Sequence, residues 1–157
     1  MHRILYLIRG LPGTGKTTLG RTLSTNVFSA DDFFVGSDGE FRYDHTRIGD
    51  AQKWCQELLQ KWRSTGRESA VVANTFSRRW EMQPYLLWRP ADVRLVVIDL
   101  FDQGLSDKVL AARNTHGVLE TKIAEMRARW EFDWAQAPVD RAEMPPGRPR
   151  LGWPRRE

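Results

Sequence analysis

One glycine-rich stretch constrains the fold of this chain more than any other part: residues 10–18, which read GLPGTGKTT. It fits the pattern G-x-x-x-x-G-K-[ST], and its surroundings fit as well. An apolar run at 3–8 precedes it and is short enough for a buried strand. After it, Leu19 and Leu23 fall on one face of a helix that begins near Lys16. Strand, loop and helix in this order predict a phosphate-binding loop.

Each residue type in this loop has a physical role toward a phosphate chain. Glycines let the backbone curl so that several N–H groups point at one anion, and the helix N-terminus adds partial positive charge. Lys16 is placed to reach the outer phosphates, and Thr17 offers a hydroxyl to Mg²⁺. We therefore predict binding of ATP with Mg²⁺. The predicted nucleotide-binding residues are Gly10, Gly13, Thr14, Gly15, Lys16, Thr17 and Thr18.

Strand-like and helix-like segments alternate along the rest of the chain. Short apolar runs predict strands at 3–8, 26–30, 70–73 and 93–100. Helical spacing predicts helices at 16–24, 45–64, 78–88 (with Ser77 as N-cap), 106–113 and 119–134. This alternation is typical of an α/β doubly wound domain with a mainly parallel sheet of about four strands.

The composition is that of a soluble globular protein, with 41% hydrophobic and 28% charged residues in 157. Cys55 is the only cysteine, so no internal disulfide can form, and we expect a buried structural thiol in a reducing compartment. No apolar run approaches the roughly 20 residues of a membrane span, which predicts a cytoplasmic protein with no membrane partner. The formal charge of +4 favours an anionic partner, although ATP alone would satisfy it. The oligomeric state is left open.

Polar side chains follow three of the predicted strands, at the edge where sites form in doubly wound sheets. Asp31-Asp32 follows the second strand, Asn74-Thr75 follows the third, and Asp99 lies at the end of the fourth. A kinase needs a carboxylate that orients the acceptor hydroxyl and takes its proton. We predict Asp32 as this base and Asp31 as a ligand of Mg²⁺ or a helix cap. Capping by both carboxylates is the structural alternative.

An arginine at the end of a helix stands where a small kinase would carry a lid. Arg113 precedes a glycine-containing turn, and closure of this turn would bring its charge to the triphosphate in the transition state. The alternative is a solvated arginine favoured by the helix dipole. His116 in the same turn fits a lid role or a plain turn equally well. Arg78 follows the third strand and is a candidate for contacts with backbone phosphates.

Residues 138–157 differ in composition from everything before them. They contain five prolines, and five arginines stand against Asp140, Glu143 and Glu157. We predict a P-loop kinase domain at 1–137, followed by a mobile or loosely docked tail. The alternative is a basic tail that grips nucleic acid with the help of Trp153.

Four runs in this order resemble the P-loop polynucleotide kinase family, enzymes similar to the kinase half of bacteriophage polynucleotide kinase. They are GLPGTGKTT, ADDFF, NTFSRRWEMQPY and AARNTHGV, and the resemblance covers 3–134. It implies transfer of the ATP γ-phosphoryl group to a hydroxyl of a nucleic acid (DNA or RNA), usually the 5′-OH. By the family pattern, Lys16 and Thr17 hold phosphate and Mg²⁺, Asp32 is the general base and Arg113 is a lid arginine.

Two positions depart from the pattern of the phage enzyme, and both concern the acceptor. That enzyme has an arginine three residues after the base, where this chain has Val35, and an aspartate before the polar pair of the third strand, where this chain has Ala73. We therefore expect the nucleotide side to be intact and the acceptor contacts to be altered. The candidates for these contacts are Asp32, Arg42, Asn74, Thr75 and Arg78.

Three other functions are compatible with the same sequence. Related kinases phosphorylate the hydroxymethyl group of a modified pyrimidine within DNA, and such a target would have to be unstacked. A small-molecule or nucleoside kinase would use the same chemistry. A catalytically silent nucleotide-binding module, suggested by Ala73, would have no need of Asp32. Five aromatic residues near the predicted site either stack a base or pack in the core: Phe33, Phe34, Phe41, Tyr43 and Trp80.

Overall fold

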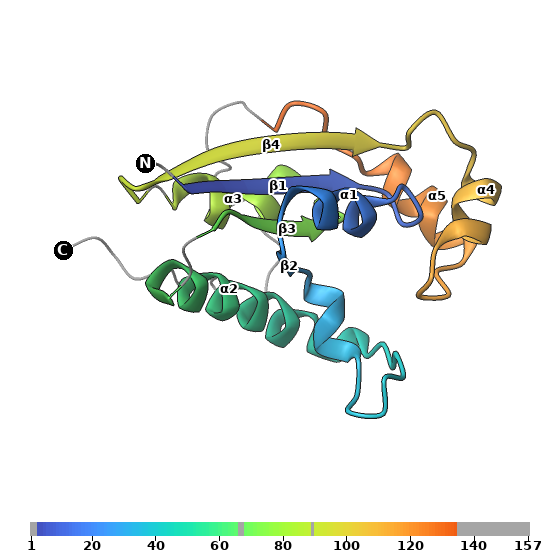
Figure 1. Ribbon diagram of the computed structural model, residues 1–157. Coiled ribbons are helices and arrows are strands. Elements are labelled where there is room, and N and C mark those ends of the chain that lie inside the picture. Colours follow the sequence, from blue (N-terminus) through green and yellow to red (C-terminus); the bar gives the residue numbers. More distant parts are fainter. Residues whose placement is uncertain (1–2, 66–67, 89, 135–157) are drawn as a thin grey trace.

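Four parallel strands form one sheet, in the order β2-β3-β1-β4 (Figure 1). Leu7 in the middle of the first strand lies opposite Val72 on one side and Val97 on the other. This computed structural model describes residues 3–65, 68–88 and 90–134. The α/β fold with a parallel sheet is confirmed. The strands are β1 (Arg3–Gly10), β2 (Asn26–Phe28), β3 (Ala70–Asn74) and β4 (Val93–Phe101).

Helices cover both faces of the sheet (Figure 1). On one face lies α1 (Lys16–Leu23), whose Leu19 and Leu23 pack against Ile8 and Val71 of the sheet. The other face carries α2 (Ile48–Thr65) and α3 (Arg79–Leu87). Successive residues of a strand point to opposite faces, so β1 and β3 must be apolar at nearly every position. This explains why both read as continuous apolar runs in the sequence.

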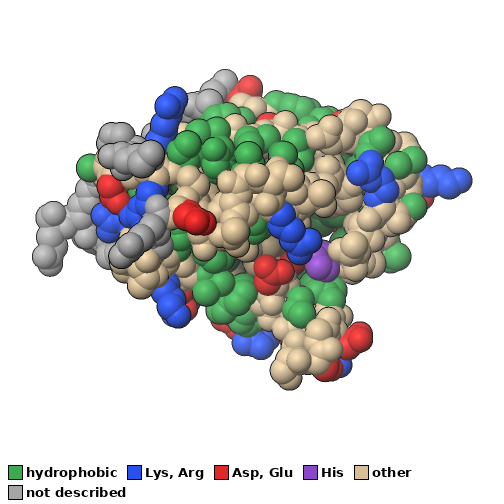
Figure 2. Space-filling model, viewed as in Figure 1, with side chains coloured by type: hydrophobic (Ala, Val, Ile, Leu, Met, Phe, Trp, Pro, Cys, Tyr) green, Lys and Arg blue, Asp and Glu red, His purple; other side chains and the backbone are tan. Residues whose placement is uncertain are grey.

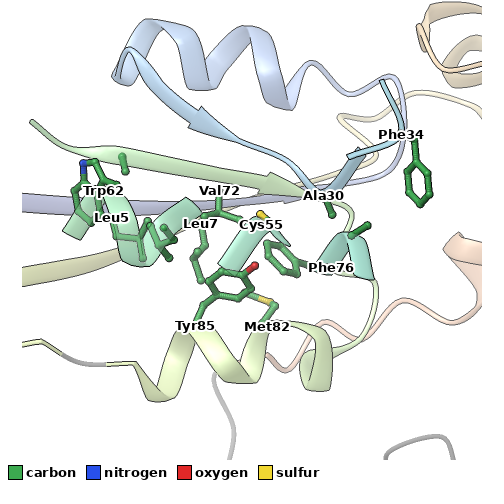
Figure 3. Close-up of a cluster of buried hydrophobic side chains, with 13 residues drawn as sticks. Leu5, Leu7, Ala30, Phe34, Cys55, Trp62, Val72, Phe76, Met82 and Tyr85 are labelled. Carbon is green, nitrogen blue, oxygen red and sulfur yellow. The ribbon is translucent and has the colours of Figure 1, made fainter. Parts of the chain in front are cut away.

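The largest hydrophobic cluster fills the space between the sheet, α2 and α3 (Figure 3). Leu7 and Val72 from the sheet meet Cys55 of α2, and Met82 and Tyr85 of α3, all fully buried. Each fully buried aliphatic side chain of this size stabilises the fold by about 1.5–3 kcal/mol relative to exposure. Burial also raises the pKa of the Cys55 thiol to about 11. The cysteine is therefore a protonated packing residue, as predicted from the sequence.

Two short helices close the end of the domain where the strands finish. Figure 1 shows α4 (Asp107–Arg113) and α5 (Glu120–Ala128) beyond the arrowheads of β1 and β4. They are joined to the phosphate loop by a separate hydrophobic cluster, in which Leu11 of the loop packs with Leu110 and Ile123. The loop is therefore packed against α4 and α5 as well as against the sheet.

Several predicted boundaries differ from the structure, and two of the differences have a tertiary cause. The second strand ends at Phe28 instead of residue 30, because residues 30–34 form a 3₁₀ helix, η1 (Ala30–Phe34), held by a side chain of β3. The last helix ends at Ala128 instead of residue 134, because the backbone N–H of Glu131 donates to the carbonyl of Ser77 (2.8 Å). A second 3₁₀ helix, η2 (His45–Arg47), occupies the start of the helix predicted at 45–64.

The start of α3 also differs from prediction by one residue. Arg78, and not Ser77, is the N-cap. The hydroxyl of Ser77 donates to the carboxylate of Glu81 (3.0 Å), which also accepts from the backbone N–H of Arg78 (2.8 Å). Among the described residues, no helix combines the length and apolarity that crossing a bilayer requires. The tail predicted at 138–157 lies outside the described residues.

Candidate active site

The phosphate loop between β1 and α1 is curled by its own hydrogen bonds. Thr14 donates to the carbonyl of Leu11 from its backbone N–H (3.3 Å) and from its hydroxyl (2.8 Å). Gly13 has φ +84°, and a Cβ there would lie 2.4 Å from the carbonyl oxygen of Leu110 in α4. Only glycine fits this position, because any side chain would meet the backbone of a packed helix. The sequence motif therefore takes the predicted loop shape.

The loop ends at the N-terminus of α1, where unpaired backbone N–H groups favour an anion. Gly15 is the N-cap, and Thr17 and Thr18 lie exposed in the first turn.

No cluster of three or more His, Cys, Asp or Glu side chains that could hold a metal occurs in the described parts of the chain. Mg²⁺ commonly takes only one or two protein ligands and completes its shell with substrate phosphates and water. The donors Thr17 and Asp31 fit that mode of binding.

Lys16 folds back over the loop from the start of α1. Its Nζ donates to the carbonyl oxygens of Gly10 (2.8 Å) and Leu11 (3.0 Å). Burial lowers the pKa of Lys16 to about 8, and the carboxylate of Asp31 opposes this shift. The charge of Asp31 thus acts on the lysine of the phosphate loop. Phosphate oxygens would compete with the two carbonyls for the ammonium protons.

Asp31 and Asp32 lie in η1, which a buried side chain of β3 holds in place. The Oδ1 atom of Asn74 accepts from the backbone N–H of Ala30 (2.9 Å) and from the hydroxyl of Ser29 (3.4 Å). Ser29 in turn caps η1 by accepting from the N–H of Asp31 (3.3 Å). Asn74 is 7% exposed, so the structure gives it a supporting role beneath the aspartates. The predicted contact of Asn74 with substrate stays a prediction.

The surroundings of Asp32 suit a proton acceptor. Burial by the neighbouring protein raises the pKa of this carboxyl, and the adjacent charge of Asp31 raises it further. His116 and Arg21 act in the opposite direction. The residue still reaches solvent, so an acceptor can approach it. A carboxylate with a raised pKa binds a proton more readily than an ordinary aspartate.

The turn between α4 and α5 reaches the aspartates from the other side. Its shape is fixed by Asn114, whose Nδ2 donates to the carbonyls of Ala111 (2.8 Å) and Val118 (3.0 Å), and whose Oδ1 accepts from the N–H of Val118 (2.8 Å). The Nε2 atom of His116 lies 3.9 Å from Oδ2 of Asp31. In Figure 2, acidic, basic and histidine side chains gather beside hydrophobic ones on the face that carries α1.

Arg113 occupies the last residue of α4 and is exposed. It follows Leu110 by three residues, so the two side chains leave the helix on the same face. Because Leu110 packs against the phosphate loop, the arginine is within one helical turn of that contact. This position suits the predicted lid arginine, and its role there stays a prediction.

Three further predicted acceptor contacts have different surroundings. Arg42 forms an exposed ion pair with Asp38 through two hydrogen bonds (3.0 and 2.6 Å). Water screens both charges of such an exposed pair, so Arg42 can exchange this partner for a phosphate. The carbonyl of Thr75 accepts from the backbone N–H of Gly10 (3.3 Å), which ties the loop after β3 to the phosphate loop. Arg78 is the exposed N-cap of α3.

The two residues that depart from the polynucleotide kinase pattern lie in different surroundings. Val35 is 39% exposed beside η1, in an isolated antiparallel bridge with Phe41. Ala73 is buried in β3 opposite Ile8, within the cluster beneath α1. The first position therefore carries an apolar, partly exposed side chain, and at the second a small residue fills the core.

Arg9, directly before the phosphate loop, was missed by the sequence analysis. Its guanidinium is fully buried and donates to the carbonyls of Phe76 (3.1 and 2.7 Å), Ser77 (3.3 Å) and Glu131 (2.8 Å). It also pairs with Asp99 (3.1 Å) and lies 4.1 Å from the ring centroid of Trp130. The only signal in the sequence is a charge at the end of an apolar strand. Asp99, considered at first as a site carboxylate, is thus a partner of this buried arginine.

Comparisons with known proteins agree with this geometry. A family model described as an AAA domain matches residues 5–132, which include the phosphate loop, η1 and the α4–α5 turn. NEDD4-binding protein 2 of Homo sapiens is 32% identical over 135 residues, covering 82% of this chain and 8% of that protein. The chain therefore corresponds to a small part of that relative. Because the match covers most of its length, the chain belongs to this family of AAA domains and is a nucleotide-binding protein of the P-loop kinase-like type.

Proposed function

We propose that this protein is an ATP-dependent kinase that transfers the γ-phosphoryl group to a hydroxyl of a nucleic acid, with the 5′-OH of a polynucleotide preferred. The observation that carries the proposal is the position of Asp32. Its carboxyl has a raised pKa and lies in η1, which the side chain of Asn74 holds in place. The other aspartate of η1, Asp31, acts electrostatically on Lys16 of the phosphate loop. A protein that only binds nucleotide has no need of a proton acceptor at this place.

On the donor side, the phosphate loop and the N-terminus of α1 bind the triphosphate through backbone N–H groups. Lys16 neutralises charge on the outer phosphates, and Arg113 adds a second positive charge when the α4–α5 turn closes. Thr17 and Asp31 would hold Mg²⁺, which would supply positive charge against the phosphates.

On the acceptor side, Asp32 hydrogen-bonds the hydroxyl and accepts its proton. The hydroxyl oxygen forms the new bond to the γ-phosphorus as the bond from that phosphorus to the β–γ bridging oxygen breaks, and ADP leaves. General-base assistance of this kind contributes a factor of about 10²–10⁴ in rate. The choice of a nucleic acid as acceptor rests on the runs ADDFF and AARNTHGV, which resemble polynucleotide kinases.

The test is phosphoryl transfer from γ-labelled ATP to a panel of acceptors: 5′-OH DNA, 5′-OH RNA, DNA with hydroxymethyl-pyrimidine, and free nucleosides. We expect label on the 5′-OH polynucleotides. Label on the modified DNA alone would move the acceptor to a base. Label on nucleosides alone would make the protein a small-molecule kinase, and ATP binding without transfer to any acceptor would favour the silent module.

Two substitutions test the residue roles in the same assay. Asp32→Asn should lower turnover by at least about a hundredfold and leave ATP affinity nearly unchanged, because the amide cannot take the proton. The matched control is Asp50→Asn, which changes an exposed aspartate that pairs with Arg47 and has no proposed role in the site. Near-wild-type turnover in Asp32→Asn would remove Asp32 as the base. Lys16→Ala should abolish ATP binding, and retained affinity would contradict the phosphate-loop assignment.

A further inference from the structure

Burial separates the aromatic residues near the aspartates into two groups. Phe34 and Trp80 are each 8% exposed, and Phe33 packs edge-on against Phe34 with its centroid 5.3 Å away. Phe34 and Trp80 therefore belong to the interior. Phe33 is half-buried, and the guanidinium of Arg47 lies over its ring, 4.7 Å from the centroid. Phe41 is also half-buried, whereas Tyr43 is 57% exposed, and these two can present ring surface to a molecule that approaches from solvent.

A third ring joins this pair from a distant part of the chain. The imidazole of His116 lies 4.3 Å from the ring centroid of Phe41, with 35° between the planes. The ring of Tyr43 also neighbours Phe41, with the centroids 6.5 Å apart and the planes nearly parallel (21°). The three rings thus form one surface, which we name the ring platform: Phe41, Tyr43 and His116. The side chain of His116 is 34% exposed, so this surface is open to solvent.

Both loops that carry the ring platform are ordered by their own hydrogen bonds. In the first, the backbone N–H of Gly36 donates to the carbonyl of Glu40 (2.9 Å), and that of Arg42 donates to the carbonyl of Phe34 (2.9 Å). In the second, the side chain of Asn114 fixes the turn that carries His116. A ligand that stacks on rings held in this way loses less free energy to the ordering of side chains.

The ring platform adjoins the proposed proton acceptor. Nε2 of His116 is 3.9 Å from Oδ2 of Asp31, and Asp32 is the next residue in η1. His116 also acts electrostatically on Asp32, so a hydroxyl held at Asp32 would place the rest of its own molecule beside the turn that carries His116. Exposed apolar side chains are common on proteins, but a contiguous ring surface next to a catalytic carboxylate is an arrangement that nucleobases bind by stacking.

We infer that the ring platform is the subsite that stacks the nucleobase of the nucleotide whose hydroxyl is phosphorylated. The inference rests on the proposed function and specifies how its acceptor is bound. Every base has a π-face, so stacking of this kind tolerates any sequence. The platform therefore requires that a base be present, whichever base it is.

The closing experiment compares two single-stranded DNA oligonucleotides of the same sequence, labelled at the 3′ end with a fluorophore. One has an ordinary 5′ nucleoside, and the other has a 5′ sugar without a base. Their affinities are measured by fluorescence anisotropy in the presence of a non-hydrolysable ATP analogue, and their phosphorylation is measured separately with ATP. We expect the wild-type protein to bind the oligonucleotide with the base at least about fivefold more tightly, the lower end for one stacked base.

Substitutions separate stacking from charge. His116→Ala and Tyr43→Ala should each reduce the preference toward one. His116→Phe should keep it, because a ring remains while the contact with Asp31 is lost. The matched control is Leu87→Ala, which removes an apolar side chain of similar exposure (59%) at the far end of α3. A wild-type preference below about twofold, or a preference that survives both alanine substitutions, would overturn the inference.

Binding and transfer also distinguish this inference from the proposed function. Base-dependent binding without phosphorylation of either oligonucleotide would support the ring platform and overturn the kinase assignment. Phosphorylation of both oligonucleotides with equal affinity would support the kinase assignment and overturn the platform.

Discussion

Replacement of Arg9 by methionine should destabilise the domain severely, because the guanidinium is fully buried and connects three separate segments. Methionine keeps much of the length but none of the donors. The carbonyls of Phe76 and Glu131 and the carboxylate of Asp99 would then lose their partner. Breaking a buried ion pair from one side costs about 3–5 kcal/mol. Asp99 is 27% exposed and can be hydrated in part, so we expect the low end, about 3 kcal/mol.

The free energy of unfolding can be measured by urea denaturation followed by tryptophan fluorescence. For a domain of this size, a loss of about 3 kcal/mol lowers the urea midpoint by roughly 1–3 M. The matched control is Arg94→Met, which removes an exposed arginine from the neighbouring strand β4 and should change stability by less than about 0.5 kcal/mol. A loss below about 1 kcal/mol for Arg9→Met would refute the reasoning, because the buried groups would then have found other partners.

Two further predictions concern the site. The pKa of Lys16 is lowered to about 8, so its ammonium deprotonates as the pH rises through that value. ATP affinity, measured by calorimetry, should fall about tenfold from pH 7 to pH 9, and a pH-independent affinity would contradict the burial of this lysine. The free energy of unfolding should rise with pH over about pH 8 to 10.5, because in this range Lys16 is protonated in the unfolded chain and deprotonated in the folded one. Asn74→Ala should lower turnover by misplacing Asp32 while ATP affinity changes little, and equal losses in both would show a general defect of the fold instead.

Local order in the sequence was sufficient to predict the phosphate loop, the alternation of strands and helices, and the aspartate pair after β2. These features depend on neighbouring residues: glycines at fixed spacing, Lys16 at the helix start, and apolar runs of strand length. The loop must then lie at the carboxyl edge of a parallel sheet, since strands in such a sheet share one direction. For this reason the sequence alone predicts that Asp31 lies near the phosphate loop.

The sequence could not rank the polar and aromatic candidates that depend on distant partners. Asn74 and Arg42 look alike as polar residues near a site, yet one is buried beneath η1 and the other is exposed in an ion pair with Asp38. Phe41 and Phe34 are both aromatic, but only burial shows which one faces solvent. Burial is a property of the packed chain, and local sequence indicates it only as an average.

The sequence by itself determined what the donor side of the site is, because a phosphate loop is built from consecutive residues whose backbone conformation follows from their own chemistry. The tertiary structure alone decided which distant segments support and surround the site. Asn74 reaches Ala30, Arg9 reaches Glu131, and His116 reaches Phe41, each across a long stretch of chain. Such contacts form only when packing brings the segments together, and no local pattern encodes which segments will meet.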